Sequence, residues 1–392
     1  MPMLITSNHD LSLFCDRARD AGVVYLDTEF VTEESYLPRL EIIQMEVEGQ
    51  IVIVDYQSLG SSDSLWGLLY DAHIEKVFHA AKQDLSIFYQ QSGQPMTNIF
   101  DTQIAAAFVG IGEQISYAEL VRTVTGVGLS KSHTYSDWGR RPLSDAQIAY
   151  AQDDVKYLPQ ITAHLKKQLA DLGRTDWAVE EFREMEQITS TDPSASEDLY
   201  LRVKGMSALR PKELAILREL AIWRDQEAMH RNRPIGRVLK DEQIVNLVRH
   251  APQSLEELRD VRGFPEHLAN QLGRGILDAV GAGLATPKEQ WPSRPEGRYV
   301  SPGQQATVAL MQALIRLRAM EEQSAGRLLS NSSELEELAM RAPNIDPQDF
   351  RVLRGWRYEM IGHDLLRLLK GEIGLTVDPE TGRAIPIEIS PP

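Results

Sequence analysis

Cysteine is almost absent from this chain, since Cys15 is the only one among 392 residues. A single cysteine excludes a disulfide framework and is typical of a protein in a reducing compartment. Together with the lack of an H-E-x-x-H motif, it argues against a zinc site. The longest apolar run, residues 104–111, is far shorter than the roughly 20 residues that span a bilayer. The N-terminus also lacks the features of a secretory signal, so we expect a cytoplasmic protein without membrane segments.

A phosphate-binding loop is also lacking. Gly126, Gly128 and Lys131 hint at one, but the spacing G-x₄-G-K-[ST] does not occur. That spacing is needed because the loop backbone must cradle the phosphates while the lysine reaches them. The sequence therefore gives no support to a nucleotide-driven motor.

The net charge of −16 argues at first against a nucleic-acid partner, because phosphate binding usually requires a basic surface. The acid is unevenly distributed, however. Residues 1–170 hold 12 Lys+Arg against 22 Asp+Glu, whereas residues 206–285 hold 12 against 11. A metal site in the first segment would use part of the excess acid. Charge alone leaves the partner undecided.

The first 170 residues have the pattern of an α/β domain. Runs rich in β-branched residues predict strands, and longer amphipathic segments predict helices. Strands followed by strand–helix alternation predict a mixed sheet flanked by helices. We expect strands at 23–30, 40–47, 50–55 and 76–80, and helices at 8–20, 82–91, 101–109, 116–124 and 144–168.

The rest of the chain loses its strand signals. An acidic, Ser/Thr-rich stretch at 171–205 has the composition of a linker. Helical periodicity then predicts a small bundle at 206–285, and a Pro/Gly-rich second linker follows at 286–303. Residues 304–375 return to helical spacing in a similar order, which indicates a weak internal duplication. The tail, 376–392, is expected to be extended or mobile.

The first chemical signal is Asp27-Thr28-Glu29 at the end of a predicted strand. Side chains two residues apart share a face, so Asp27 and Glu29 point together while Thr28 points away. Two carboxylates on one face repel each other and are costly to desolvate. A hard divalent cation removes both problems. The alternative is a strand end that carries two ordinary surface acids.

Two further signals lie downstream. Asp84 falls in the first turn of a predicted helix, just after a strand that ends near His79. The helix dipole favours an acid there whatever the function, and His79 is expected to pack or to hydrogen-bond near the site. Tyr150 and Asp154 are four residues apart, hence on one helix face, whereas Asp153 is rotated toward solvent.

In combination the three signals are much more specific. In this order they resemble the tyrosine subgroup of the DEDD exonucleases, and most closely the ribonuclease D family. The likeness extends to LEIIQ (40–44), VFHAAKQDL (77–85) and SDWGRRPLSDAQIAYAQDDVKYL (136–158). The two helical modules resemble the helicase-and-RNase-D C-terminal (HRDC) type, the first well and the second loosely.

This resemblance implies an RNase H-like 3′–5′ exonuclease domain followed by two HRDC-like helical bundles. It implies two divalent ions, Mg²⁺ or Mn²⁺, and a tyrosine that either orients the attacking water or assists its deprotonation. The substrate would be RNA with a single-stranded 3′ end, tRNA precursors in particular, cut to 5′-monophosphates by a monomer. The implied metal ligands are Asp27, Glu29, Asp84 and Asp154, and the implied catalytic tyrosine is Tyr150.

Basic residues outside these motifs are candidates for RNA contacts. The stretch 223–240 combines aromatic and basic residues, although a solvated helix end explains it equally well. Two arginines beside Trp138 could guide a single strand by charge and stacking, but Trp138 could equally be a packing residue. The candidates are Arg140, Arg141, Arg231, Arg233, Arg237 and Lys240.

Two other functions stay open at this point. The same nuclease superfamily includes DNA 3′–5′ exonucleases, from which the HRDC-like modules and the run 136–158 distinguish this chain. A catalytically silent RNA-binding module is the alternative from another class. The presence of all five implied catalytic residues argues against it.

Overall fold

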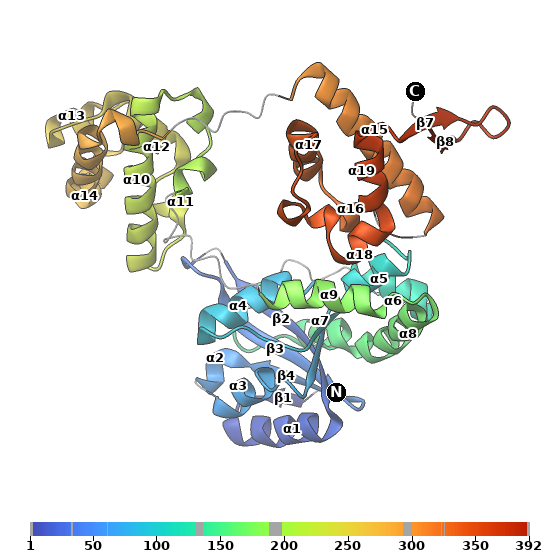
Figure 1. The fold of residues 1–392 in the computed structure, drawn as a ribbon. Helices are drawn as coiled ribbons and strands as arrows, with labels where there is room; N and C mark the ends of the chain where they lie inside the picture. Colours follow the sequence, from blue (N-terminus) through green and yellow to red (C-terminus); the bar gives the residue numbers. More distant parts are fainter. Residues whose placement is uncertain are drawn as a thin grey trace.

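An α/β domain is followed by two helical modules that stand on the same side of it (Figure 1). This order confirms the predicted fold class. Among the residues that the structure describes, no helix is long and apolar enough to cross a bilayer. The computed structural model describes residues 3–32, 34–60, 62–129, 136–187, 198–292, 300–322, 324 and 326–389.

A mixed sheet of six strands forms the centre of the α/β domain, in the order β1-β4-β3-β2-β5-β6. Three strands, β2, β3 and β4, form an antiparallel meander, and the others pair in parallel with their neighbours. The strands are β1 (Met3–Ile5), β2 (Val23–Val31), β3 (Arg39–Val47), β4 (Gln50–Asp55), β5 (Glu75–Phe78) and β6 (Ile99–Asp101).

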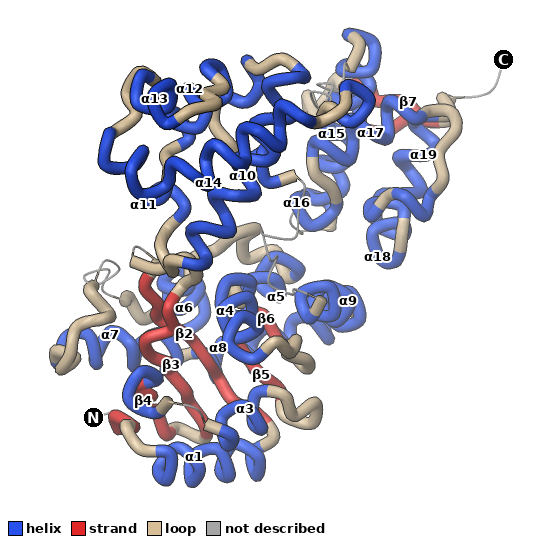
Figure 2. Tube along the Cα trace, turned by 90° about the vertical axis from the view of Figure 1, so that its left-hand side faces the viewer, coloured by secondary structure: helices blue, strands red, loops and turns tan. Residues whose placement is uncertain are grey.

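Helices cover both faces of this sheet (Figure 2). Alternate residues of β2 therefore enter different cores: Val24 and Leu26 pack with α1 and α3, whereas Tyr25 packs with α5, α6 and α8. The helices are α1 (Asn8–Ala21), α2 (Tyr56–Leu59), α3 (Asp63–Leu69), α4 (Lys82–Ser92), α5 (Thr102–Phe108), α6 (Tyr117–Thr125), α7 (Asp145–Lys156), α8 (Leu158–Asp171) and α9 (Thr175–Glu186).

The main differences from the predicted elements involve short or interrupted segments. Strands β1 and β6 have three residues each, too few for a periodic pattern, and neither was predicted. The helix expected over 144–168 is two helices, because the chain turns at Tyr157 before α8, which carries Pro159 in its first turn.

The first helical module encloses a core of its own. Its buried residues come from Leu199 to Val280, and Tyr36 is the residue of the α/β domain that packs against them in the described part of the chain. The predicted bundle is confirmed. Its helices are α10 (Pro211–His230), α11 (Ile235–Val238), α12 (Asp241–His250), α13 (Leu255–Asp260) and α14 (Glu266–Ala285).

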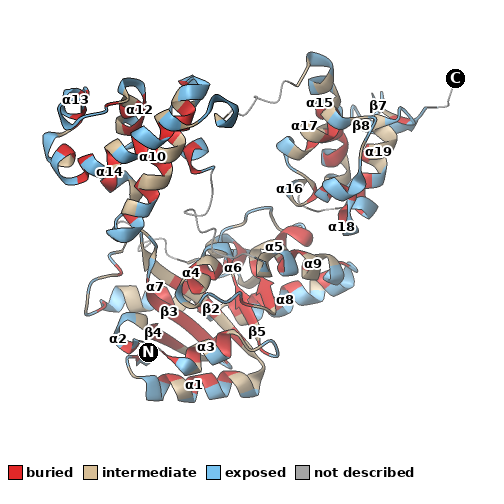
Figure 3. Ribbon diagram, turned by 60° about the vertical axis from the view of Figure 1, so that its left-hand side comes forward, coloured by how far each residue is buried: buried red, intermediate tan, exposed pale blue. Residues whose placement is uncertain are grey.

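The second helical module shares its core with the α/β domain. One buried cluster joins Phe108 and Leu165 of that domain to Met311 and Trp356 of the module. Figure 3 marks the buried residues on the helices of both modules and on the sheet. The helices are α15 (Pro302–Glu321), α16 (Gly326–Leu329), α17 (Ser332–Arg341), α18 (Gly355–Arg357), a π-helical turn (Tyr358–Gly362) and α19 (His363–Leu369).

Two segments differ from the expectation of linker or tail. The stretch 171–205 was predicted as a linker, yet it contains α9, whose Ala178 and Phe182 are buried. Acidic residues on the outer face hid this amphipathic pattern. The tail pairs β7 (Ile373–Val377) with β8 (Ala384–Glu388) in an antiparallel hairpin, so it is extended but not irregular. The remaining domain limits stay predictions.

Candidate active site

The sheet leaves one side of β2 open where the first two acids lie. Strand β2 pairs with β3 along most of its length but with β5 only from Val23 to Tyr25. Beyond Phe78 the chain turns away through Ala80, which has a left-handed backbone (φ 61°), and enters α4. The Ala81 amide donates to Asp101 Oδ2 at 2.7 Å and fixes this turn. Helix α4 therefore begins beside the free part of β2.

Asp84 reaches β2 from the first turn of α4. It is buried, and the Thr28 hydroxyl donates a hydrogen bond to its Oδ1 atom. The sequence predicted that Thr28 points away from the acidic face of β2; its buried side chain alternates with the half-buried Asp27 and Glu29. Thr28 thus holds the carboxylate of Asp84 against the strand that carries the other two acids.

Helix α7 supplies the last acid and the tyrosine. It packs against β2, β3 and β4, so it covers the face to which Asp27 and Glu29 belong. Tyr150 and Asp154 lie one turn apart on α7. The Oδ2 atom of Asp154 is buried and has no hydrogen-bond partner among the described residues. A buried carboxylate oxygen without a partner fits a cation ligand, because such an oxygen is otherwise costly.

Electrostatic coupling shows that the four carboxylates lie close together. Burial raises the pKa of Asp27 well above its usual range, and the charges of Asp154, Asp84 and Glu29 raise it further. Burial, Asp154 and Asp84 raise the pKa of Glu29 to about 8. Burial likewise raises the pKa of Asp84 to about 7 and that of Asp154 to about 7. We refer to Asp27, Glu29, Asp84 and Asp154 as the acidic site.

The acidic site fits a hard divalent cation by its donor chemistry. Carboxylate oxygens are the ligands that Mg²⁺ and Mn²⁺ prefer. A cation would offset the burial that raises these pKa values and the repulsion that adds to it at Asp27 and Glu29. Within the described residues, no three acidic, histidine or cysteine side chains are already arranged around one point as ligands. Rotation of the four side chains would therefore be required to close a coordination shell.

Two aromatic residues support this arrangement. His79 lies between Thr102 Oγ1 and the Ile115 carbonyl, at 3.0 and 3.1 Å, so both ring nitrogens are engaged and it packs near the site as predicted. Tyr117, which the motifs did not reveal, donates to the Asp153 carbonyl at 3.1 Å and accepts from the Tyr157 amide at 3.3 Å. It thereby fixes the last turn of α7, which contains Asp154.

Gln44 is a further residue that the sequence did not single out, although it ends the LEIIQ run. It stands opposite Asp27 in the β2–β3 register, so the two side chains share a face. Gln44 is fully buried, and neither atom of its amide has a hydrogen-bond partner among the described residues. A polar residue in the middle of a buried strand was the available signal, but only the register places it beside Asp27.

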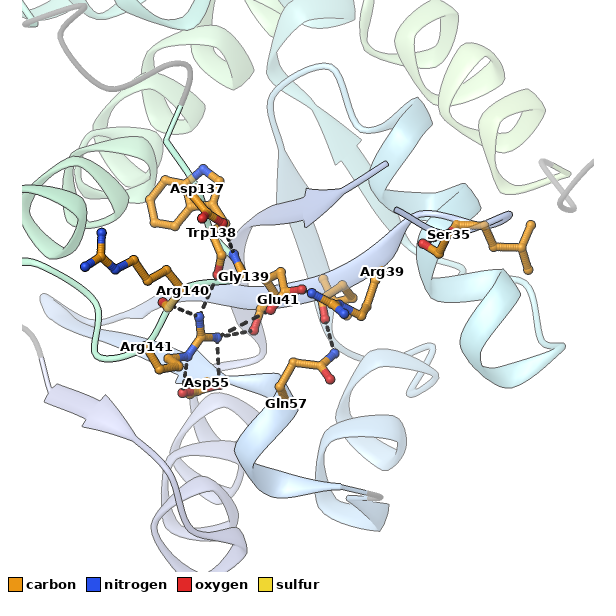
Figure 4. A network of polar contacts seen from close by, with 12 residues as sticks. Ser35, Arg39, Glu41, Asp55, Gln57, Asp137, Trp138, Gly139, Arg140 and Arg141 are labelled. Carbon is orange, nitrogen blue, oxygen red and sulfur yellow. Dashed lines mark hydrogen bonds and ion pairs between the residues drawn. The ribbon is translucent and has the colours of Figure 1, made fainter. Parts of the chain in front are cut away.

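Arg141 occupies a different environment from the one expected of an RNA contact. Its guanidinium forms a two-pronged ion pair with Asp55, at 2.6 and 2.9 Å, and bonds to the Trp138 carbonyl at 2.6 Å (Figure 4). Glu41 lies 3.7 Å away on the other side. With its donors used in this way, Arg141 ties the segment before α7 to the sheet, and the expectation of a phosphate contact is corrected accordingly.

A β-bulge explains how Glu41 joins this network. The register shifts between Glu29 and Phe30, so that Glu41 is the extra residue on β3. Bulges redirect side chains, and Glu41, almost fully buried, pairs with Arg39 at 2.5 Å. The bulge therefore lies beside an acid of the site and anchors the segment that leads to Tyr150.

The other predicted RNA contacts are surface residues. Trp138 is buried against Ile42 and Ile53, which supports the packing alternative, while the neighbouring Arg140 is exposed. The four basic candidates of the first module are exposed at the end of α10 and around α11, and Arg231 pairs with Glu227. These residues, which stay candidates, are Arg140, Arg231, Arg233, Arg237 and Lys240.

Comparison with known families matches the two parts of the chain separately. Residues 2–170 match a family described as 3′-5′ exonuclease. Residues 213–280 match the HRDC domain. The first match contains the whole acidic site, and the second falls within the first helical module.

Known proteins resemble the chain over nearly its full length. A ribonuclease D of Gluconacetobacter diazotrophicus is 36% identical over 388 residues, which cover 98% of this chain and 97% of that protein. One of Nitrobacter hamburgensis is 37% identical over 395 residues, covering 99% and 100%. The crystal structure of Escherichia coli RNase D, described as an exoribonuclease involved in structured RNA processing, superimposes with a TM-score of 0.83 at 29% identity, covering 95% of this chain and 99% of that one.

Proposed function

We propose, since the chain belongs to the ribonuclease D family of 3′–5′ exoribonucleases, that it trims structured RNA, tRNA precursors in particular, by hydrolysis at the acidic site. The resemblance to an E. coli enzyme of structured RNA processing supports the choice of substrate. One chain supplies all four acids, which supports a monomer as the acting unit. Its lone buried cysteine is compatible with the reducing cytoplasm.

The observation that carries this proposal is the gathering of buried and half-buried carboxylates from three separate elements. Strand β2, helix α4 and helix α7 each contribute, and the charges of Asp84 and Asp154 add to burial in raising the pKa values of Asp27 and Glu29. Natural proteins rarely gather buried charges of one sign without a compensating cation. Stability alone gives no reason for the arrangement, whereas catalysis of phosphodiester hydrolysis does.

The metal chemistry follows from the donor set. Two divalent ions, Mg²⁺ or Mn²⁺, bound by the acidic site would stabilise the attacking and the leaving oxygen of an in-line displacement. Two features of the chain's own residues suit such metal binding. Thr28 orients the Asp84 carboxylate, and the buried Oδ2 atom of Asp154 has no hydrogen-bond partner among the described residues, which leaves it available to a cation.

Tyr150 is the proposed partner of the attacking water. It precedes Asp154 by one turn of α7, and its ring lies 6.1 Å from that of the buried Trp138, which limits its rotation. An ordinary tyrosine has a pKa near 10, so it would orient the water through its hydroxyl or accept a proton only in a strongly cationic field. The product of attack at a 3′-terminal phosphodiester would be a nucleoside 5′-monophosphate.

Replacement of Asp154 by asparagine tests the assignment, with Asp153→Asn as the matched control. Asp153 is the adjacent residue on the same helix, but its side chain is 43% exposed. Since even outer-shell partners of a metal are worth about 10–100-fold, we expect Asp154→Asn to lower the rate at least about 100-fold. The substrate is a 3′-extended tRNA with and without Mg²⁺ or Mn²⁺. Equal rates for the two variants would contradict the acidic site.

Substrate and polarity are tested in parallel reactions. A blocked 3′ hydroxyl should prevent degradation, and an RNA oligomer should be degraded faster than its DNA counterpart. Faster degradation of the DNA oligomer would favour the alternative of a DNA 3′–5′ exonuclease activity. RNA binding without any metal-dependent degradation would instead identify a silent binding module.

A further inference from the structure

The connection between β2 and β3 links the acidic site to the first helical module. It leaves β2 after Val31 and returns at Arg39, and Tyr36 lies within it. Tyr36 is seven positions after Glu29 in sequence, so at full extension the two residues are at most roughly 25 Å apart. Whatever Tyr36 holds is therefore kept near the acids of β2.

Tyr36 contacts the first module in three ways. Its hydroxyl donates to Asp225 Oδ2 at 2.8 Å, and its backbone amide donates to Asn232 Oδ1 at 3.1 Å. Its ring packs against the separate core of that module. Main chain, hydroxyl and ring all point to the same partner, so the contact is specific in orientation as well as in position.

The partner residues are themselves well fixed. Asp225 is buried in α10, with 2% of its surface exposed. Asn232 lies just after α10 in a left-handed conformation (φ 46°), which asparagine tolerates better than most residues. The contact thus grips the C-terminal end of α10, which faces the α/β domain in Figure 1.

The basic residues of the first module begin at the same point. Arg231 and Arg233 flank Asn232 directly, and Arg237 and Lys240 follow around α11, all of them exposed. The same contact that seats Tyr36 therefore places Arg231 and Arg233, the first two of these cations, at the end of α10 that faces the α/β domain. Charges in this position suit the phosphates of a strand whose 3′ end lies in the acidic site.

We propose that Tyr36 is a positioning residue that determines substrate length preference. It acts as a latch that holds the basic segment 231–240 beside the acidic site, so that an RNA long enough to reach both is bound more tightly than a shorter one. This inference rests on the proposed function of the acidic site. Tyr36 itself need not touch the RNA.

The test compares two RNAs with the same 3′ sequence, a trinucleotide and a single strand of about 20 nucleotides. The variants are Tyr36→Phe, which removes only the hydroxyl, and Tyr36→Ala, which also removes the ring. For the long RNA we expect KM to rise about tenfold in Tyr36→Phe, the equivalent of one hydrogen bond to a charged acceptor, with kcat nearly unchanged. Tyr36→Ala, which also loses the ring contact, should have a larger effect, and for the trinucleotide both variants should match the parent protein.

Tyr358→Phe is the control, because this partly exposed tyrosine belongs to the second module and should leave both KM values unchanged. Hydrogen exchange over residues 228–233 reports on the latch directly, and it should speed up in Tyr36→Ala. Unchanged KM for the long RNA would overturn the proposal. So would a fall in kcat on the trinucleotide, because Tyr36 would then act through the acids themselves.

A wrong assignment of the acidic site would give a different result from a wrong assignment of Tyr36. If the parent protein degrades neither RNA in the presence of Mg²⁺ or Mn²⁺, the acidic site is misassigned, whatever the variants do. In that case the affinity of the parent protein and the variants for a long RNA, measured by fluorescence anisotropy, still tests whether Tyr36 acts as a latch. Equal affinities would reject it, and weaker binding by Tyr36→Ala would support it.

Discussion

The two helical modules are attached to the nuclease domain in opposite ways. The first has its own core and meets the domain at Tyr36, through a polar contact at the end of α10. The second continues the hydrophobic core of the domain, so that residues of α5, α8 and α9 pack with those of α15 and α18. The two modules have a similar helical pattern, but only the second shares a hydrophobic core with the nuclease domain.

Polar contacts strengthen the second attachment. Glu181 of α9 is almost fully buried and pairs with Arg357, which is 1% exposed, at 2.6 Å. It also pairs with Arg351 at 2.5 Å and accepts from the Trp356 indole at 3.2 Å. The rings of Trp177 and Trp356 stack with centroids 5.4 Å apart. The second module is thus part of the structural scaffold of the nuclease domain, whereas the first module is the one proposed to contact the substrate.

The largest expected effect comes from breaking the buried pair. Glu181→Ala leaves Arg357 buried without its counter-charge, which should destabilise the nuclease domain and the second module together by about 3–5 kcal/mol. Denaturant-dependent hydrogen exchange resolves the segments. Exchange in α8 and α15 should become faster together, and exchange in α10 should not change.

The matched control for this change is Glu184→Ala. Glu184 also pairs with Arg351, at 2.6 Å, but both side chains are more than two-fifths exposed, and exposed pairs contribute at most about 1 kcal/mol. If Glu181→Ala loosened α15 but left α8 unchanged, the two units would be independent after all. The comparison between the modules would then fail.

The sequence predicted much of the fold because long elements carry their pattern within themselves. The alternation of VVYLDTEF and the 3.6-residue spacing of α10, α12 and α14 were enough to predict those elements. Strand β6 and helix α9 were missed because their identity depends on partners. Phe182 of α9, for example, packs against Phe100 of β6, and the centroids of the two rings are 5.0 Å apart. The shared core of the second module is likewise a property of docking, which periodicity does not encode.

The candidate site shows the same limit. Motif order was sufficient to propose the four acids and Tyr150, because each lies on a recognisable element. The roles of Thr28, Tyr117 and Gln44 were not predicted, since they arise from a register or a loop contact. Arg141 was proposed as an RNA contact because it lies beside Trp138 in sequence, whereas Asp55, with which it pairs, lies 86 residues away.

The pH dependence of stability should also differ between the nuclease unit and the first module, by less than the effect of Glu181→Ala. Glu29, Asp84 and Asp154 have pKa values of about 8, 7 and 7 in the folded protein, above their ordinary values near 4. Without metal the folded state therefore binds more protons than the unfolded state, and its stability falls as the pH rises from about 4 to 8. We expect Tm of the nuclease unit to fall over this window in EDTA, by a few degrees.

Divalent ions should oppose this loss, because they replace the protons that the raised pKa values retain. The rise in Tm caused by Mg²⁺ should accordingly be larger at pH 8 than at pH 5.5. Hydrogen exchange in α10 should show neither dependence, because the first module contains none of the four acids. Glu29→Gln should flatten the pH profile, and an unchanged profile would mean that other groups cause it.

The smallest expected effect comes from single arginines on the surfaces of the two modules. Replacing one in each module tests which module contacts RNA. Arg233 of the first module and Arg316 of the second are both exposed, and the structure records no ion pair of either with a described residue. A lysine or arginine that contacts one phosphate of a single strand contributes about 0.7 to the slope of log K against log salt. Arg233→Gln should therefore weaken binding of a long RNA about two- to threefold at moderate salt and reduce that slope by about this amount. Arg316→Gln should change neither, because α15 belongs to the scaffold, and unfolding should be unaffected in both variants. If Arg316→Gln reduced the slope as much as Arg233→Gln, RNA would cross both modules, and their different attachment would not reflect a division of labour.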